Sequence, residues 1–168
     1  SIIFLFQFGG PSHIDMFDRK PDAPEGIRGP LKGIPTKLPG VHVCEGLARV
    51  ARIMDKVTLI RSMHHKMKNH NSPAYYALTG HNPPVDDIRL RDSQDLFPAY
   101  ASVVDKLAPS GNAEMPTAIS YPHVIRDGPI TPGQHASFLG KVHDPFLVTR
   151  DPNASDFKLP ELSLPADI

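Results

Sequence analysis

The chain has 168 residues, enough for one domain with a hydrophobic core. Its 18 Lys and Arg residues balance 18 Asp and Glu residues, so the formal net charge of +0 gives no reason to expect a nucleic-acid partner. The single cysteine, Cys44, excludes an internal disulfide, and no apolar stretch approaches the roughly 20 residues of a membrane span.

The first part of the chain predicts two strands, with a long loop and a helix between them. Residues 2–8 are β-branched and aromatic and carry no charge, which is typical of a buried strand. Residues 19–43 are rich in Pro and Gly and predict a loop. Residues 45–56 place apolar side chains at helical spacing and predict an amphipathic helix. Residues 57–61 predict the second strand.

The rest of the chain continues this alternation. Residues 72–79 predict a short helix that Asn71 or Ser72 caps. Residues 95–107 predict another amphipathic helix, and residues 116–121 predict a third strand. Strands alternating with helices favour an α/β fold with a mostly parallel sheet flanked by helices. Pro and Gly, with 19 and 12 residues, predict long ordered loops between these elements.

The segment 64–81 carries four histidines and follows the predicted strand 57–61 directly. In an open α/β sheet, the loop after a strand is where sites are usually built, and a helix N-terminus favours anions. A phosphate or sulfate ester is therefore expected to contact Asn71, with Ser72 as nucleophile and His70 as acid, base or metal ligand. The alternative is that Asn71 and Ser72 only cap the helix.

A second polar loop follows the predicted strand 2–8. There Asp15 is a candidate ligand for a divalent cation, and Ser12 and His13 are candidate substrate contacts; the alternative is that these side chains only stabilise local turns. Arg61 is placed to clamp an oxyanion with two N–H groups, or else to bond loop carbonyls. Further candidates for contacts at the rim of a site follow the third strand: His123, Arg126, Asp127 and His135.

Several motifs along the chain carry a family resemblance. They are FGGPSHIDMFDRKP at 8–21, IRGP at 27–30, LIRSM at 59–63, HNSPAYYALTG at 70–80 and FLG at 138–140. With these motifs the chain resembles the bacterial domain-of-unknown-function family 1501 over essentially its whole length.

That resemblance implies a sulfatase-like protein of the alkaline-phosphatase-like superfamily. Residues 1–168 would be the N-terminal part of a single sulfatase-like domain whose C-terminal remainder lies outside this sequence, so the fold would be incomplete. The implied activity is hydrolysis of a small-molecule or polysaccharide ester of sulfate or phosphate, with a divalent metal (Ca, Mg or Zn). The implied location is periplasmic or secreted. The alternative is a catalytically inactive, exported binding or surface protein with the same fold.

The segment ALTG at 77–80 resembles the end of the sulfatase signature. Counting back from Gly80, the sulfatase nucleophile position falls on His70 and the arginine position on Ala74, so neither residue type is reproduced. The predicted site has three parts: catalytic His70 and Ser72, metal ligands Asp15 and His70, and substrate contacts Ser12, His13, Arg61 and Asn71.

Overall fold

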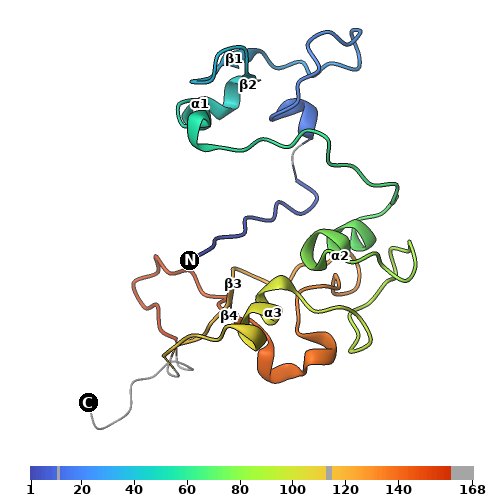
Figure 1. The fold of residues 1–168 in the computed structure, drawn as a ribbon, viewed down its shortest axis with the longest axis vertical. Coiled ribbons are helices and arrows are strands. Elements are labelled where there is room, and N and C mark those ends of the chain that lie inside the picture. Colours follow the sequence, from blue (N-terminus) through green and yellow to red (C-terminus); the bar gives the residue numbers. More distant parts are fainter. Residues whose placement is uncertain (11, 113–114, 160–168) are drawn as a thin grey trace. The chain divides into compact units, whose positions relative to one another are not determined.

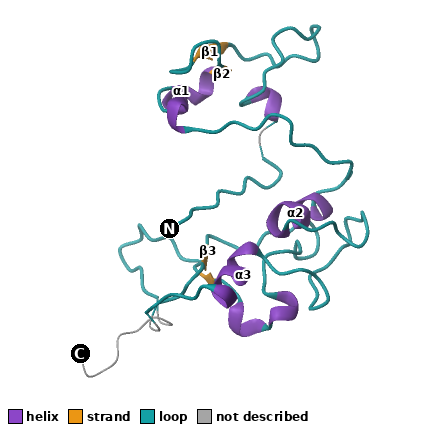
Figure 2. Ribbon diagram, in the orientation of Figure 1, coloured by secondary structure: helices purple, strands orange, loops and turns teal. Residues whose placement is uncertain are grey.

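The computed structural model describes residues 1–10, 12–112 and 115–159 (Figure 1). The chain divides into two compact units, Ser1–His65 and Lys66–Ile168, and each is described here by itself. Most of the described backbone is loop, interrupted by short helices and strands (Figure 2). Among the described residues, no helix combines the length and the apolar character needed to cross a membrane.

The regular elements are short. The α-helices are α1 (Ala48–Ala51), α2 (Asn71–Thr79) and α3 (Tyr100–Leu107). The strands are β1 (Gly33–Pro35), β2 (His42–Cys44), β3 (Ile119–Ser120) and β4 (Phe146–Leu147). Single 3-10 turns lie at His13–Asp15, Glu45–Leu47, Met54–Lys56, Ser137–Leu139 and Lys141–His143.

The predicted fold class is wrong for the described chain. In place of a mostly parallel, alkaline-phosphatase-like sheet flanked by helices there are two small sheets, an antiparallel pair β1–β2 and a parallel pair β3–β4. The segments 2–8 and 57–61 are not strands, and the predicted third strand shortens to β3. A strand needs a neighbour to pair its backbone and layers to cover its faces. Among the described residues, the segment 2–8 has neither a neighbouring strand nor a covering layer.

Exposure of the N-terminal segment shows how far it is from a buried strand. Ile2, Ile3 and Leu5 are 94%, 85% and 84% exposed. The rings of Phe4 and Phe6 stack with centroids 6.2 Å apart, as side chains two residues apart do on one face of an extended chain. The segment therefore keeps strand-like side-chain alternation, although it belongs to neither of the two sheets that the described residues form.

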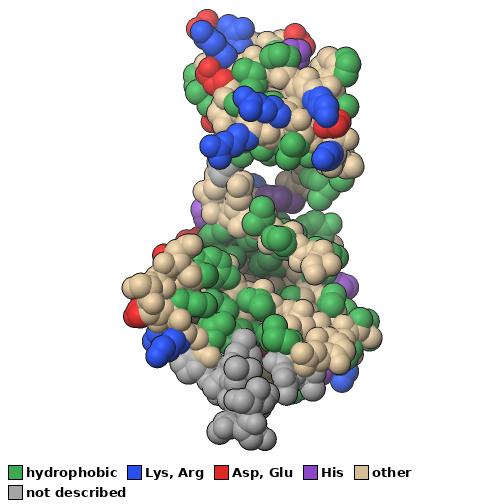
Figure 3. Space-filling view, turned by 90° about the vertical axis from the view of Figure 1, so that its left-hand side faces the viewer, with side chains coloured by type: hydrophobic (Ala, Val, Ile, Leu, Met, Phe, Trp, Pro, Cys, Tyr) green, Lys and Arg blue, Asp and Glu red, His purple; other side chains and the backbone are tan. Residues whose placement is uncertain are grey.

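The unit Ser1–His65 is built around the hairpin β1–β2, all of which except Cys44 lies within the predicted loop 19–43. Strands β1 and β2 pair with Ile34 opposite Val43, and residues of 45–56 pack on them. Val43 and Met54 are fully buried, and Ala51 is 5% exposed. The helix predicted over 45–56 is present only in part, because α1 covers four residues and the rest forms two 3-10 turns. On the face drawn in Figure 3, Lys and Arg side chains are spread over this unit among acidic and uncharged ones, not gathered in one block.

In the other unit, α2 confirms the helix predicted at 72–79. Pro73 lies in its first turn, where the missing N–H costs nothing. Gly80 ends it with φ +76°, a left-handed conformation that glycine adopts readily. The capping side chain lies earlier than predicted, since Asn69 Oδ1 accepts the N–H of Ser72 at 2.9 Å.

Helix α3 begins at Tyr100, five residues later than predicted. Pro98 explains the delay, because a proline disfavours helical backbone in the residue before it. The apolar face is also less buried than predicted, since Tyr100, Val104 and Leu107 are 50%, 49% and 77% exposed. A small cluster of Tyr75, Leu90 and Leu96 forms the apolar core of this unit.

Candidate functional site

The predicted site residues of the first loop form a local turn. Ser12 Oγ accepts the N–H of Ile14 at 3.3 Å and caps the 3-10 turn His13–Asp15, while the side chain of His13 is exposed. The capping alternative for Ser12 is therefore realised. Its prediction as a substrate contact, like that of His13, stays a prediction.

Asp15, like Asp92, has one carboxylate oxygen that is buried without a hydrogen-bond partner among the described residues. In Asp15 this atom is Oδ1. Gly29 makes room for it, since a Cβ at that position would lie 2.7 Å from Oδ1. A buried carboxylate oxygen without a donor is costly, and a bound cation is one way to offset that cost. The role of Asp15 as a metal ligand stays a prediction.

Arg61 holds two parts of its unit together. Its Nε donates to the carbonyl of Phe17 at 2.9 Å, and its Nη2 donates to the carbonyl of His42 at 3.1 Å. The chain before the hairpin is thereby tied to strand β2. Both bonds go to backbone oxygens, as the alternative role of Arg61, bonding loop carbonyls, predicts.

Asn71 is completely buried and joins three segments of its unit. Its amide nitrogen donates to the carbonyl oxygens of Ile88 and Asp127, and its Oδ1 accepts the hydroxyl of Thr131 at 2.7 Å. Buried loop carbonyls need such donors, because water cannot reach them. Asn71 therefore pins two distant loops to the first turn of α2.

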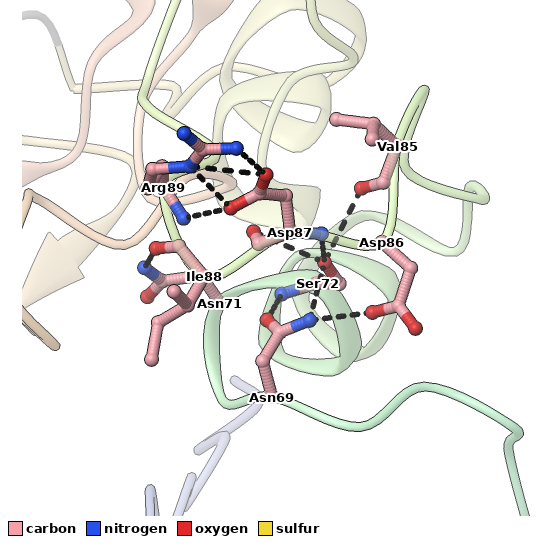
Figure 4. Close-up of polar contacts among 8 residues, drawn as sticks. All are labelled: Asn69, Asn71, Ser72, Val85, Asp86, Asp87, Ile88 and Arg89. Carbon is pink, nitrogen blue, oxygen red and sulfur yellow. Dashed lines mark hydrogen bonds and ion pairs between the residues drawn. The ribbon is translucent and has the colours of Figure 1, made fainter.

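Ser72 is completely buried as well. Its Oγ accepts the N–H of Asp87 at 3.1 Å and an amide N–H of Asn69 at 3.2 Å, and lies 3.3 Å from the carbonyl oxygen of Val85 (Figure 4). The segment 85–87 covers the hydroxyl. The Ser72 hydroxyl therefore connects the segment 85–87 to α2 by hydrogen bonds, and the same segment shields the hydroxyl from solvent.

His70 contrasts with these two neighbours because its side chain is 61% exposed. Its Nδ1 lies 3.0 Å from Oδ2 of Asp127. A carboxylate at Nδ1 fixes the orientation of an imidazole ring and favours the tautomer whose basic nitrogen is Nε2. The sequence predicted Asp127 only as a contact at the rim of a site. In the structure Asp127 is the partner of His70.

Two further His–Asp pairs lie in the same unit. His135 Nδ1 is 2.7 Å from Asp92 Oδ2, and His143 Nδ1 is 2.8 Å from Asp105 Oδ2. The contact with Asp92 raises the pKa of His135, and the hydrogen bond from His143 lowers the pKa of Asp105. The partners are far apart in the sequence, and no motif links them, so sequence reasoning missed both pairs.

A complete metal site is not found within the described residues, where no three His, Cys, Asp or Glu side chains are grouped to hold an ion. The predicted ligands Asp15 and His70 belong to different units. Ser12, His13 and Arg61 share the unit of Asp15, and Asn71 and Ser72 share that of His70. Within its unit, His70 is joined to Asp127 and follows the capping residue Asn69.

The sequence matches a family model described as "protein of unknown function (DUF1501)" over residues 1–168. The chain belongs to the DUF1501 family. The resemblance drawn from the motifs is thereby confirmed. No curated protein and no solved structure matches the chain. Membership of the DUF1501 family covers both units but names no activity, substrate or metal.

Proposed function

We propose that this DUF1501 chain is part of a hydrolase of sulfate or phosphate esters, in which His70 is the acid–base group and Asp127 orients its ring. One observation carries this proposal. The imidazole of His70, in the segment that resembles the sulfatase signature, is exposed and lies against the carboxylate of Asp127. The substrate class is a small-molecule or polysaccharide ester.

Ester hydrolysis needs a group that takes a proton from the attacking nucleophile and one that returns it to the leaving oxygen. An imidazole serves both steps when a carboxylate holds Nδ1 and Nε2 faces the reactants. His70 also precedes the first residue of α2, where the helix dipole favours a nearby anion. Asn71 and Ser72 then act by fixing the turn that presents His70.

The other two His–Asp pairs provide a built-in contrast. The imidazoles of His135 and His143 are 31% and 17% exposed, against 61% for His70. Each has a carboxylate at Nδ1, so the pairing itself does not distinguish His70. Accessibility does, because a catalytic base must reach its substrate.

The proposed divalent metal is supported by one residue. The unpartnered Oδ1 of Asp15 suits a hard cation, for which carboxylate oxygens are preferred ligands. The described residues of neither unit complete a site around it, so the roles of His70 and Asp127 above do not depend on a metal. The proposed location remains periplasmic or secreted.

Turnover of an aryl sulfate and an aryl phosphate by the full chain tests this function, with and without a metal chelator. We expect His70→Gln to lower kcat by about 10²- to 10⁴-fold, the usual contribution of an acid–base group. Asp127→Asn should lower it less, and the matched control His143→Gln should leave it nearly unchanged. Turnover that is absent in the wild type, or equal in His70→Gln, would contradict the proposal.

A second candidate function is binding of an anionic ester without turnover. The burial of Ser72 favours it, because the hydroxyl nearest the nucleophile position is enclosed by 85–87. Equilibrium binding of a non-hydrolysable aryl sulfonate, together with no detectable turnover of either ester, would select this function over the first.

A further inference from the structure

A pocket of about 250 Å³ opens in the unit Lys66–Ile168. Its lining includes two phenylalanines, Phe97 and Phe138, and the side chain of His81. These residues have no part in the function proposed above. Most other lining side chains are apolar, which is typical of small-molecule sites.

The aromatic wall of the pocket is preformed. The rings of His81 and Phe97 stack with centroids 3.5 Å apart and planes 6° apart, and Phe138 meets Phe97 edge-on at 5.7 Å and 76°. The backbone of Phe97 is held by its N–H, which donates to the Tyr75 hydroxyl at 2.8 Å. A ligand ring therefore meets aromatic surfaces that are already in place, which keeps the ordering cost of binding low.

Another part of the pocket lining comes from one face of α3. Val103, Lys106 and Leu107 lie three and four residues apart, so their side chains share that face. Leu107, which lines the same pocket as Phe97 and Phe138, is 77% exposed. Occupation of the pocket would remove part of this apolar surface from water.

Lys106 provides the one formal charge among the described residues that line the pocket. Lys106 and His81 are the ionisable side chains among its described lining residues, and no carboxylate is included. An anionic group near Lys106 would gain a charge-assisted hydrogen bond. A benzene-sized ligand fills a cavity of about 150 Å³, so the pocket has room for one ring with a small charged group.

We propose that this pocket binds a small monocyclic aromatic anion, such as an aryl carboxylate. The ring packs against Phe97 and Phe138, and the anionic group lies at Lys106. This site is independent of the proposed hydrolase function, because its residues are separate from His70 and Asp127.

Titration of the full, isotope-labelled chain with benzoate, followed by amide NMR shifts, tests the proposal. We expect saturable shifts at His81, Phe97 and Phe138, with a dissociation constant on the order of 1 mM for so small a ligand. Benzyl alcohol, which keeps the ring without the charge, should bind at least several-fold more weakly. Acetate, which keeps the charge without the ring, should give no saturable shift. Equal binding of benzyl alcohol, or no saturation by benzoate, would overturn the proposal.

Two variants locate the ligand. Lys106→Gln should weaken benzoate binding by roughly 5- to 10-fold and leave benzyl alcohol unchanged, because only the charge-assisted bond is lost. Phe138→Ala should weaken both probes, and Phe138 is 56% exposed, so its removal should not unfold the chain. The control is Lys141→Gln, an exposed lysine outside the pocket lining. An equal loss of affinity in the control would show nonspecific electrostatics and overturn the assignment.

Discussion

The two units of this chain are held together by different kinds of buried side chain. In Ser1–His65 the core is apolar, with Val43, Ala51 and Met54 between a hairpin and a short helix. In Lys66–Ile168 the completely buried side chains include polar ones, such as Asn71 and Ser72. Where long loops pack on a helix, their backbone groups need hydrogen-bond partners, and polar helix residues supply them. A buried polar residue in such a unit is therefore weak evidence for catalysis.

The largest expected effect is in the apolar unit. Met54→Ala should lower the free energy of unfolding by about 2–5 kcal/mol, because it leaves a cavity at a fully buried site. Urea unfolding measures the change, and hydrogen exchange shows whether protection is lost around β1 and β2. The neighbouring Ile53, which is 50% exposed, provides the control. If Ile53→Ala costs as much, Met54 is not the centre of this core.

The polar unit should respond next most strongly at Asn71. Asn71→Ala removes the donor of the Ile88 and Asp127 carbonyls and the acceptor of the Thr131 hydroxyl. Leaving these groups unpaired should cost about 2–4 kcal/mol in urea unfolding. Exposed Asn153 is the matched control, and its replacement by Ala should change stability by under about 0.5 kcal/mol. Similar values for the two variants would contradict the pinning role of Asn71.

Ser72→Ala should have a smaller effect on stability, about 1–2 kcal/mol, since it breaks the bonds from Asp87 N–H and the Asn69 amide. Under conditions where the variant is folded, ester turnover should stay within about threefold of wild type if the hydroxyl acts structurally. Complete loss of turnover in a fully folded variant would instead identify Ser72 as the nucleophile.

The smallest expected effect concerns pH and the pair His135–Asp92. The pKa of His135 is raised above 6.5 in the folded state, so the folded chain holds this proton more tightly than the unfolded chain. The resulting stabilisation is complete below pH 6.5 and is lost as the pH rises through the raised pKa. Urea midpoints measured across this range should fall in the wild type, and Asp92→Asn should flatten the decline.

The pKa of Asp105 is shifted in the opposite direction to that of His135, so Asp105 affects stability at the acid end of the same pH series. Its pKa is lowered from 3.8 by the hydrogen bond from His143, so its stabilisation is present above pH 3.8 and is lost as the pH falls through the lowered pKa. Asp105→Asn should therefore change the acid limb of the stability profile. An unchanged alkaline limb in Asp92→Asn would show that His135 does not contribute.

Local patterns in the sequence predicted the helices better than the sheets. The short helix before Gly80 is present in the structure, and the helix predicted at 45–56 is present in part, as α1 and two 3-10 turns. Each depends on residues within a few positions of one another. The segment predicted as a strand at 2–8 is not assigned as one among the described residues, and the hairpin β1–β2 arises largely where Pro and Gly predicted only a loop. Strand pairing depends on which segments meet, which apolar character alone does not specify.

The sequence by itself determined the family, through motifs spread over the whole chain. It also predicted the catalytic residues at the start of α2. It did not separate His70 from Ser72. Only the tertiary structure decided that Ser72 is covered by 85–87 while His70 is exposed beside Asp127. The physical reason is that burial is set by loops that return from elsewhere in the sequence, and adjacent residues of one helical turn face different loops.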